Sequence, residues 1–137
     1  MTLYLDTSVL VKLYLNEPDA DDVQALAEQA DVIVTSVVAY AEARAAFARR
    51  RRERLMTSAE AAAAVRQLDA DWPRFVRLAA DDDLGRAAGR LADRHGLRGY
   101  DAIHLASFED LLAHCEDDDV RFASADDRLN RAARRLG

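Results

Sequence analysis

Four acidic residues that are far apart in the chain fall at the ends of predicted strands or on the helices that follow them. Asp6 ends a short buried strand, and Asp126 lies just past the last predicted strand. Glu42 lies within the helix that follows the second strand, and Asp101 begins a later helix. In open parallel α/β sheets, ligands bind at the carboxyl ends of the strands. We therefore expect these four carboxylates to meet at one edge of a sheet.

The surroundings of these acids favour a bound divalent cation. Asp6 follows Leu3-Tyr4-Leu5, and Glu42 sits in an apolar stretch from Val37 to Ala43. Burying an unpartnered carboxylate is costly, and clustered carboxylates repel one another. A hard cation removes both penalties. Because Cys115 is the single cysteine, ligation by carboxylates predicts Mg²⁺ or Mn²⁺ rather than Zn²⁺. Carboxylate-held Mg²⁺ is typical of phosphodiester hydrolysis.

Each acid taken alone also has a structural interpretation. Asp6 and Asp101 stand where a carboxylate can cap the following helix, although Thr7 or Ser8 could cap the first one instead. Asp126 suits a first helical turn, and Glu42 alone is typical of a solvated helix residue. The functional interpretation therefore depends on the set, since all four acids fall at strand ends or on the helices leaving them.

Alternating strands and helices must position these acids. The apolar runs predict strands at residues 2–5, 32–34, 75–78 and 120–124. Helical periodicity and capping signals predict helices at residues 9–15, 19–30, 35–52, 57–72, 84–95, 101–114 and 126–136. This order predicts an α/β fold in which a parallel sheet of about four or five strands is flanked by helices on both faces. Residues 1–137 are expected to form one domain.

The motifs around these acids resemble those of the PIN-domain family, and more narrowly the VapC toxins of type II toxin–antitoxin modules. The resemblance is carried by Leu5-Asp6-Thr7-Ser8, by Glu42 after Thr35-Ser36, by the segment from Arg98 to Ala106, and by Ser124-Ala125-Asp126-Asp127-Arg128-Leu129. It covers nearly the whole chain and implies a PIN fold of three layers, α/β/α. It also implies an endoribonuclease that hydrolyses RNA with Mg²⁺ or Mn²⁺.

The resemblance assigns the catalytic and metal-binding roles to Asp6, Glu42, Asp101 and Asp126. Ser124 stands where the family usually has Thr, and it keeps the hydroxyl. Asp126 and Asp127 are adjacent, and the spacing from Ser124 favours Asp126 as the acid that faces the metal. Thr7, Ser8 and Ser124 are candidates to position water or a phosphate oxygen. His104 lies three residues after Asp101, so it is either a general base or a packing residue behind the metal ligands.

The resemblance also implies partners. Such toxins form homodimers and are inhibited by a cognate antitoxin whose arm covers the active site. The dense basic run Arg49-Arg50-Arg51-Arg52 is a candidate contact for RNA or for the antitoxin. Its position at a helix C-terminus also gives it a structural interpretation through the helix dipole. Trp72, Phe75, Phe108 and Tyr100 are expected in the core or in an interface.

Composition sets outer limits on function. The formal net charge of −6 argues against a simple nucleic-acid-binding protein, but acids gathered in a metal site would account for part of it. The chain shows no apolar run long enough to span a membrane and no secretory signal, so a cytoplasmic location is expected.

Three other functions are compatible with an acidic pocket. A phosphoryl-accepting receiver domain would need paired acids after the first strand and a late lysine, whereas Thr7 follows Asp6 and Lys12 is the single lysine. A non-catalytic binding module is the second alternative. A nuclease acting on DNA is the third, because a metal cluster alone does not distinguish ribose from deoxyribose.

Overall fold

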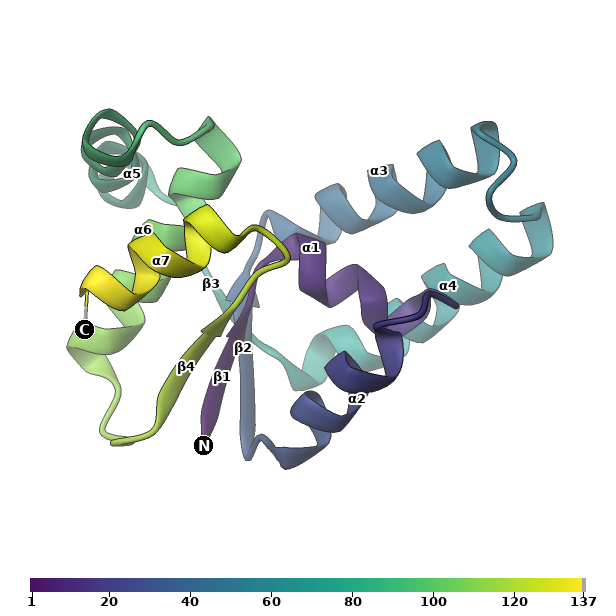
Figure 1. Ribbon diagram of the computed structural model, residues 1–137, viewed down its shortest axis with the longest axis horizontal. Helices are drawn as coiled ribbons and strands as arrows, with labels where there is room; N and C mark the ends of the chain where they lie inside the picture. The colour runs from purple at the N-terminus through teal and green to yellow at the C-terminus, as the bar shows by residue number, and fades with distance from the viewer. Residues whose placement is uncertain (137) are drawn as a thin grey trace.

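The computed structural model describes residues 1–136, which contain a parallel sheet of four strands (Figure 1). The strands are β1 (Thr2–Leu5), β2 (Val32–Ser36), β3 (Val76–Leu78) and β4 (Val120–Ala123), in the spatial order β3-β2-β1-β4. The register pairs Leu5 with Ala123, and the amide of Asp6 donates to the Ala123 carbonyl at 3.1 Å. The carboxyl ends of β1 and of the edge strand β4 are thus aligned, and Asp6 follows β1 directly.

Helices connect the strands in the expected alternating order. They are α1 (Thr7–Leu10), the 3₁₀ turn η1 (Val11–Tyr14), α2 (Ala20–Gln29), α3 (Ala39–Arg52), α4 (Ser58–Asp71), the 3₁₀ turn η2 (Trp72–Arg74), α5 (Asp82–His95), α6 (Gly99–His114) and α7 (Asp127–Leu136). The predicted capping box between Thr57 and Glu60 is present. At the end of α5, Gly96 adopts a left-handed conformation with φ of 62°, which glycine accommodates without strain.

Two sequence-based boundaries differ from the structure for local reasons. The first helix begins at Thr7 rather than Val9, because the Asp6 carboxylate, and not a hydroxyl of Thr7 or Ser8, accepts the Val9 amide. The helix expected to open at Thr35 begins at Ala39 instead, since β2 continues to Ser36. Asp6 therefore follows β1 directly and caps α1.

Helices cover both faces of the sheet, which confirms the three-layer α/β/α architecture (Figure 1). Alternation along β1 points Tyr4 toward α5, α6 and α7, and Leu3 and Leu5 toward α1 and α2. A third apolar cluster, which includes Phe47 and Leu68, joins α3 to α4. The α3–α4 pair extends beyond the sheet in Figure 1.

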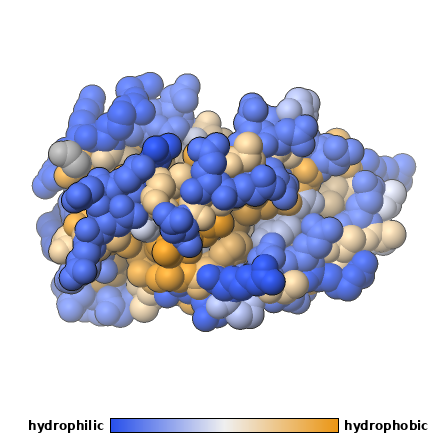
Figure 2. Space-filling model, turned by 90° about the horizontal axis from the view of Figure 1, so that it is seen from below, coloured by the Kyte–Doolittle hydropathy of each residue, from blue (hydrophilic) through white to orange (hydrophobic). Residues whose placement is uncertain are grey.

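The face shown in Figure 2 is largely hydrophilic, with apolar side chains gathered in its middle. Among the described residues, exposed large apolar side chains include Val32 and Val76, at the starts of β2 and β3. Within residues 1–136, helices with both the length and the apolar character needed to cross a bilayer are absent.

Candidate active site

Asp6 is a buried carboxylate at the centre of the sheet edge. Its residue exposure is 3%, and its Oδ1 accepts the Ser8 hydroxyl at 2.6 Å and the Val9 amide at 3.2 Å. Burial raises the pKa of Asp6 above its ordinary value, against the opposing hydrogen bonds from Ser124 and Ser8. The carboxylate thus pays a desolvation penalty that a positive charge at this position would relieve.

Glu42 reaches the same edge from α3 and is held by a network of hydrogen bonds. Its Oε1 accepts the Thr7 hydroxyl at 2.6 Å and lies 3.0 Å from the His104 Nε2. The pKa of Glu42 lies below its ordinary value: burial raises it, but the hydrogen bonds from His104 and Thr7 outweigh burial. Glu42 is therefore an ionised carboxylate with a defined orientation.

His104 is the buried centre of this network. Its Nδ1 lies 2.8 Å from the hydroxyl of Tyr4, and its Nε2 lies 3.0 Å from the Thr7 hydroxyl oxygen as well as from Glu42. A neutral imidazole protonated at Nε2 satisfies these contacts when Tyr4 donates to Nδ1. Of the two roles considered for His104, its 2% exposure and its contacts favour a residue that orients Glu42 over a general base.

Asp101 lies in the first turn of α6. Its side chain is 21% exposed and accepts a hydrogen bond from Arg98 Nε at 3.3 Å. Glu42, Tyr100 and Asp101 line one depression of about 600 Å³. The carboxylates of α3 and α6 thus open into the same space.

Asp126 is exposed and caps α7 through its Oδ1, which accepts the amides of Arg128 at 2.9 Å and Leu129 at 3.3 Å. Two serines link its loop to Asp6. The Ser124 hydroxyl accepts the Asp126 amide at 3.0 Å and lies 3.5 Å from the Ser8 hydroxyl, which binds Asp6. Asp127 instead forms the first residue of α7.

The structure therefore brings the four acids to one edge of the sheet, but their carboxylates do not surround a single position. In the part of the chain from residue 1 to 136, groups of three or more His, Cys, Asp or Glu residues arranged to hold one metal ion are absent. The chemistry of the donors nonetheless fits a hard cation: carboxylate and hydroxyl oxygens surround a buried acid whose pKa burial has raised. The residues thus suit Mg²⁺ or Mn²⁺ by donor type.

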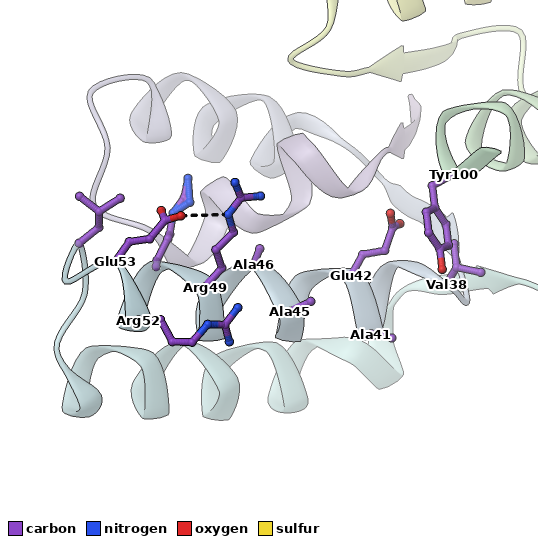
Figure 3. Close-up of a pocket in the computed structure, with 11 residues that line it drawn as sticks. Val38, Ala41, Glu42, Ala45, Ala46, Arg49, Arg52, Glu53 and Tyr100 are labelled. Atoms are coloured by element: carbon purple, nitrogen blue, oxygen red, sulfur yellow. Dashed lines mark hydrogen bonds and ion pairs between the residues drawn. The ribbon is translucent and has the colours of Figure 1, made fainter. Parts of the chain in front are cut away.

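The four consecutive arginines at the end of α3, Arg49 to Arg52, do not form one uniform patch. Arg50 pairs with Glu17 at 2.7 Å, whereas Arg49 forms an exposed pair with Glu53 at 3.1 Å. Arg49, Arg50 and Arg52 line a groove of about 950 Å³ along α3 (Figure 3). Arg51 lines a different depression. Only part of the basic run therefore faces the same space as Glu42.

Two tyrosines have surroundings that the sequence did not indicate. Tyr100 was expected in the core or in an interface; its residue exposure of 61% excludes the core, and it stands beside Glu42 (Figure 3). Its position directly before Asp101, at the start of a helix, was an available signal. Tyr4 was treated only as part of a buried strand, and its bond to His104 depends on residues 100 positions apart.

Comparison with known proteins identifies the family of this chain. Residues 3–135 match the family described as PIN domain. Ribonuclease VapC45 and Ribonuclease VapC49, both from Mycobacterium tuberculosis strains, are each 37% identical over 105 residues, which cover 77% of this chain and 73% of theirs. The crystal structure of FitAcB from Neisseria gonorrhoeae has a similar fold, with a TM-score of 0.66 at 18% identity, over 96% of this chain and 93% of that one. The chain belongs to the PIN-domain family and, within it, to the VapC group.

Proposed function

We propose that this protein is a divalent-metal-dependent endoribonuclease and the toxin component of a VapBC-type toxin–antitoxin system. The observation that carries the proposal is Asp6, a carboxylate buried at the carboxyl end of the central sheet beside the oriented Glu42. The names of the VapC relatives support ribonuclease activity. An acid that only capped a helix would not need a second, separately oriented carboxylate near it.

The proposed metal-binding residues are Asp6, Glu42, Asp101 and Asp126, and Mg²⁺ is the expected ion, with Mn²⁺ as a substitute. When bound, a divalent cation supplies Lewis-acid stabilisation of the scissile phosphate and acidifies an attacking water. The chain's own part is to hold the ligands in place. Ser8 and Ser124 position Asp6, while Thr7 and His104 position Glu42.

The charge state of Glu42 suits this role. A ligand must be deprotonated before it binds a cation, and the hydrogen bonds from His104 and Thr7 already hold Glu42 in its ionised form. Asp101 has an exposed guanidinium partner in Arg98. Such an exposed pair is weak, so it offers little resistance to a competing cation.

Cleavage by purified protein tests the proposal directly. Wild type should cut total RNA with Mg²⁺ or Mn²⁺ and not with EDTA, and Asp6→Asn should abolish cutting. Asp93→Asn, which removes the same charge from an exposed position on α5, should leave the rate unchanged. Cleavage by Asp6→Asn at the wild-type rate would show that the metal assignment is wrong. Mapping RNA 5′ ends after expressing wild type and Asp6→Asn in cells would identify the target.

The same assay separates the alternatives. A labelled single-stranded DNA substrate distinguishes an RNA-specific enzyme from a general nuclease. A non-catalytic binding module would cut neither substrate under any metal condition. The receiver-domain alternative is disfavoured by Lys12, whose ammonium is engaged in an ion pair with Asp19 at the start of α2.

The proposed partners follow from membership of the VapC group. A cognate antitoxin with a basic side chain would satisfy the carboxylates of the acidic pocket, and we expect it to inhibit cleavage. We also propose a homodimer and a cytoplasmic location, where RNA and antitoxin meet. Light scattering on the purified chain measures the oligomeric state, and a monomer at all concentrations would contradict the dimer.

A further inference from the structure

The groove along α3 connects the candidate active site with the basic end of the helix (Figure 3). Its floor is formed by the small side chains of Ala41, Ala45 and Ala46. Small side chains leave the helix surface open to close approach by a bulky ligand. Glu42 lies at one end of this floor, and Arg49 and Arg52 lie toward the other.

Tyr100 forms a wall of the groove at the Glu42 end (Figure 3). It also lines the depression that Glu42 and Asp101 share. An aromatic residue that is 61% exposed contributes little to the core, and its ring is available for stacking. Unpaired bases stack on such rings, and this interaction does not depend on base identity.

Arg49 and Arg52 are far enough from Glu42 along α3 to contact phosphates other than the one that is cleaved. At 1.5 Å of rise per residue, Arg49 lies about 10 Å and Arg52 about 15 Å along the helix axis from Glu42. Arg49 is engaged by Glu53 in an exposed i,i+4 pair, which contributes little and can be exchanged for a phosphate. Arg50 is held by Glu17, so among the three guanidinium groups that line the groove it is the least available to bind a phosphate.

We infer that the α3 groove binds single-stranded RNA, with Tyr100 stacking on an unpaired base next to the cleavage site and Arg49 and Arg52 binding phosphates farther along the strand. The inference rests on the proposed ribonuclease function and adds to it the residues that hold the substrate strand beside the cleavage site. A duplex has no free base face to offer Tyr100. An acidic protein segment would satisfy the arginines but would leave the exposed ring beside Glu42 without a stacking partner.

Equilibrium binding of a fluorescein-labelled single-stranded 12-nucleotide RNA tests this inference. All variants are made in an Asp6→Asn background with Mg²⁺ present, so that the strand stays intact. Tyr100→Ala should weaken binding about 5- to 100-fold, the effect of losing one stacked base. Tyr100→Phe, which keeps the ring, should bind as the parent does. The same RNA annealed to its complement should bind more weakly and should not respond to Tyr100→Ala.

Salt dependence tests the arginines. Each phosphate contact on a single strand contributes about −0.7 to the slope of log K against log salt. The double variant Arg49→Ala/Arg52→Ala should therefore reduce the slope by about 1.4. Arg90→Ala, at an exposed position on α5, serves as the control for loss of positive charge and should leave the slope unchanged. Tyr100→Trp adds a direct probe, because stacking should quench its fluorescence when RNA binds.

The results distinguish failure of this inference from failure of the proposed function. If Tyr100→Ala and the arginine double variant bind RNA as tightly as their parent, with the same salt slope, the inference is wrong even when wild type cleaves RNA. A groove that serves an acidic protein partner would give this result. If the variants lose binding as expected but wild type cleaves no RNA, the binding site stands and the catalytic proposal fails.

Discussion

The hydrogen bond between Tyr4 and His104 makes a sharp prediction for Tyr4→Phe. The substitution removes one hydroxyl from a side chain with 0% exposure and leaves the His104 Nδ1 without its 2.8 Å partner. Removing a buried hydrogen bond and leaving its acceptor without a partner lowers the free energy of unfolding by about 1–3 kcal/mol. For a domain of this size the melting temperature should fall by about 3–12 °C. The ring remains, so its stacking on Phe122, at 5.5 Å between centroids, should survive.

The same substitution should slow RNA cleavage. His104 orients Glu42 through Nε2, and Tyr4 fixes the tautomer and ring position of His104 through Nδ1. We expect kcat to fall about 10-fold or more, the lower range for loss of an outer-shell partner, while KM for RNA changes little. The assays are a calorimetric melt and steady-state cleavage of a labelled RNA.

Tyr14→Phe is the matched control. The Tyr14 hydroxyl also donates to a side chain, Asp71 at 2.9 Å, but it lies at the end of η1 beside α4. It should lower stability by a similar or smaller amount and leave kcat unchanged. If both variants slow cleavage equally, the effect of Tyr4→Phe is general destabilisation. If Tyr4→Phe changes neither stability nor rate, the hydrogen-bond network does not position Glu42.

Three other predictions follow from the described contacts. Mg²⁺ should raise the melting temperature of wild type but not of Asp6→Asn in a thermal shift assay, because a cation relieves the desolvated carboxylate; equal shifts would place the ion elsewhere. Asp126→Ala should cost about 1 kcal/mol in urea unfolding by removing the cap of α7, and it should also slow cleavage. Asp127→Ala should keep the cap and the activity, and the reverse result would assign the metal to Asp127. The pKa of Glu60 is lowered by its bond to the Thr57 amide, so its contribution to stability is present above the ordinary pKa and lost as pH falls through the lowered one. Glu60→Gln should flatten this part of the pH–stability curve, and an unchanged curve would contradict the role of the capping box.

The sheet and the placement of the four acids were predictable because they depend on local patterns. Short apolar runs identify the strands, and parallel order follows from their alternation with helices. Because ligand sites in open parallel sheets lie at the carboxyl ends of the strands, the four acids could be assigned to one edge without any knowledge of their contacts. These acids are Asp6, Glu42, Asp101 and Asp126. The Thr57–Glu60 capping box was also predictable, since it depends on residues three apart.

The finer features of the site depend on tertiary contacts that no local pattern records. His104 could be either a base or a packing residue until its bonds to Tyr4, Thr7 and Glu42 were known. The exposure of Tyr100 likewise depends on the tertiary structure, because tyrosine is a residue type of intermediate burial whose position residue type alone does not decide. The ion pair that engages Arg50 also depends on a distant residue, Glu17, which precedes α2.

The double role of Asp6 has a consequence for comparing related chains. Its Oδ1 caps α1, so a sequence that had lost all nuclease activity would still gain stability from an acid at this position. The presence of Asp6 is therefore weak evidence that a relative is an active enzyme. Glu42 caps no helix, and its orientation depends on Thr7 and His104. Joint retention of Thr7, Glu42 and His104 is thus the better marker for sorting active from degenerate members of the group.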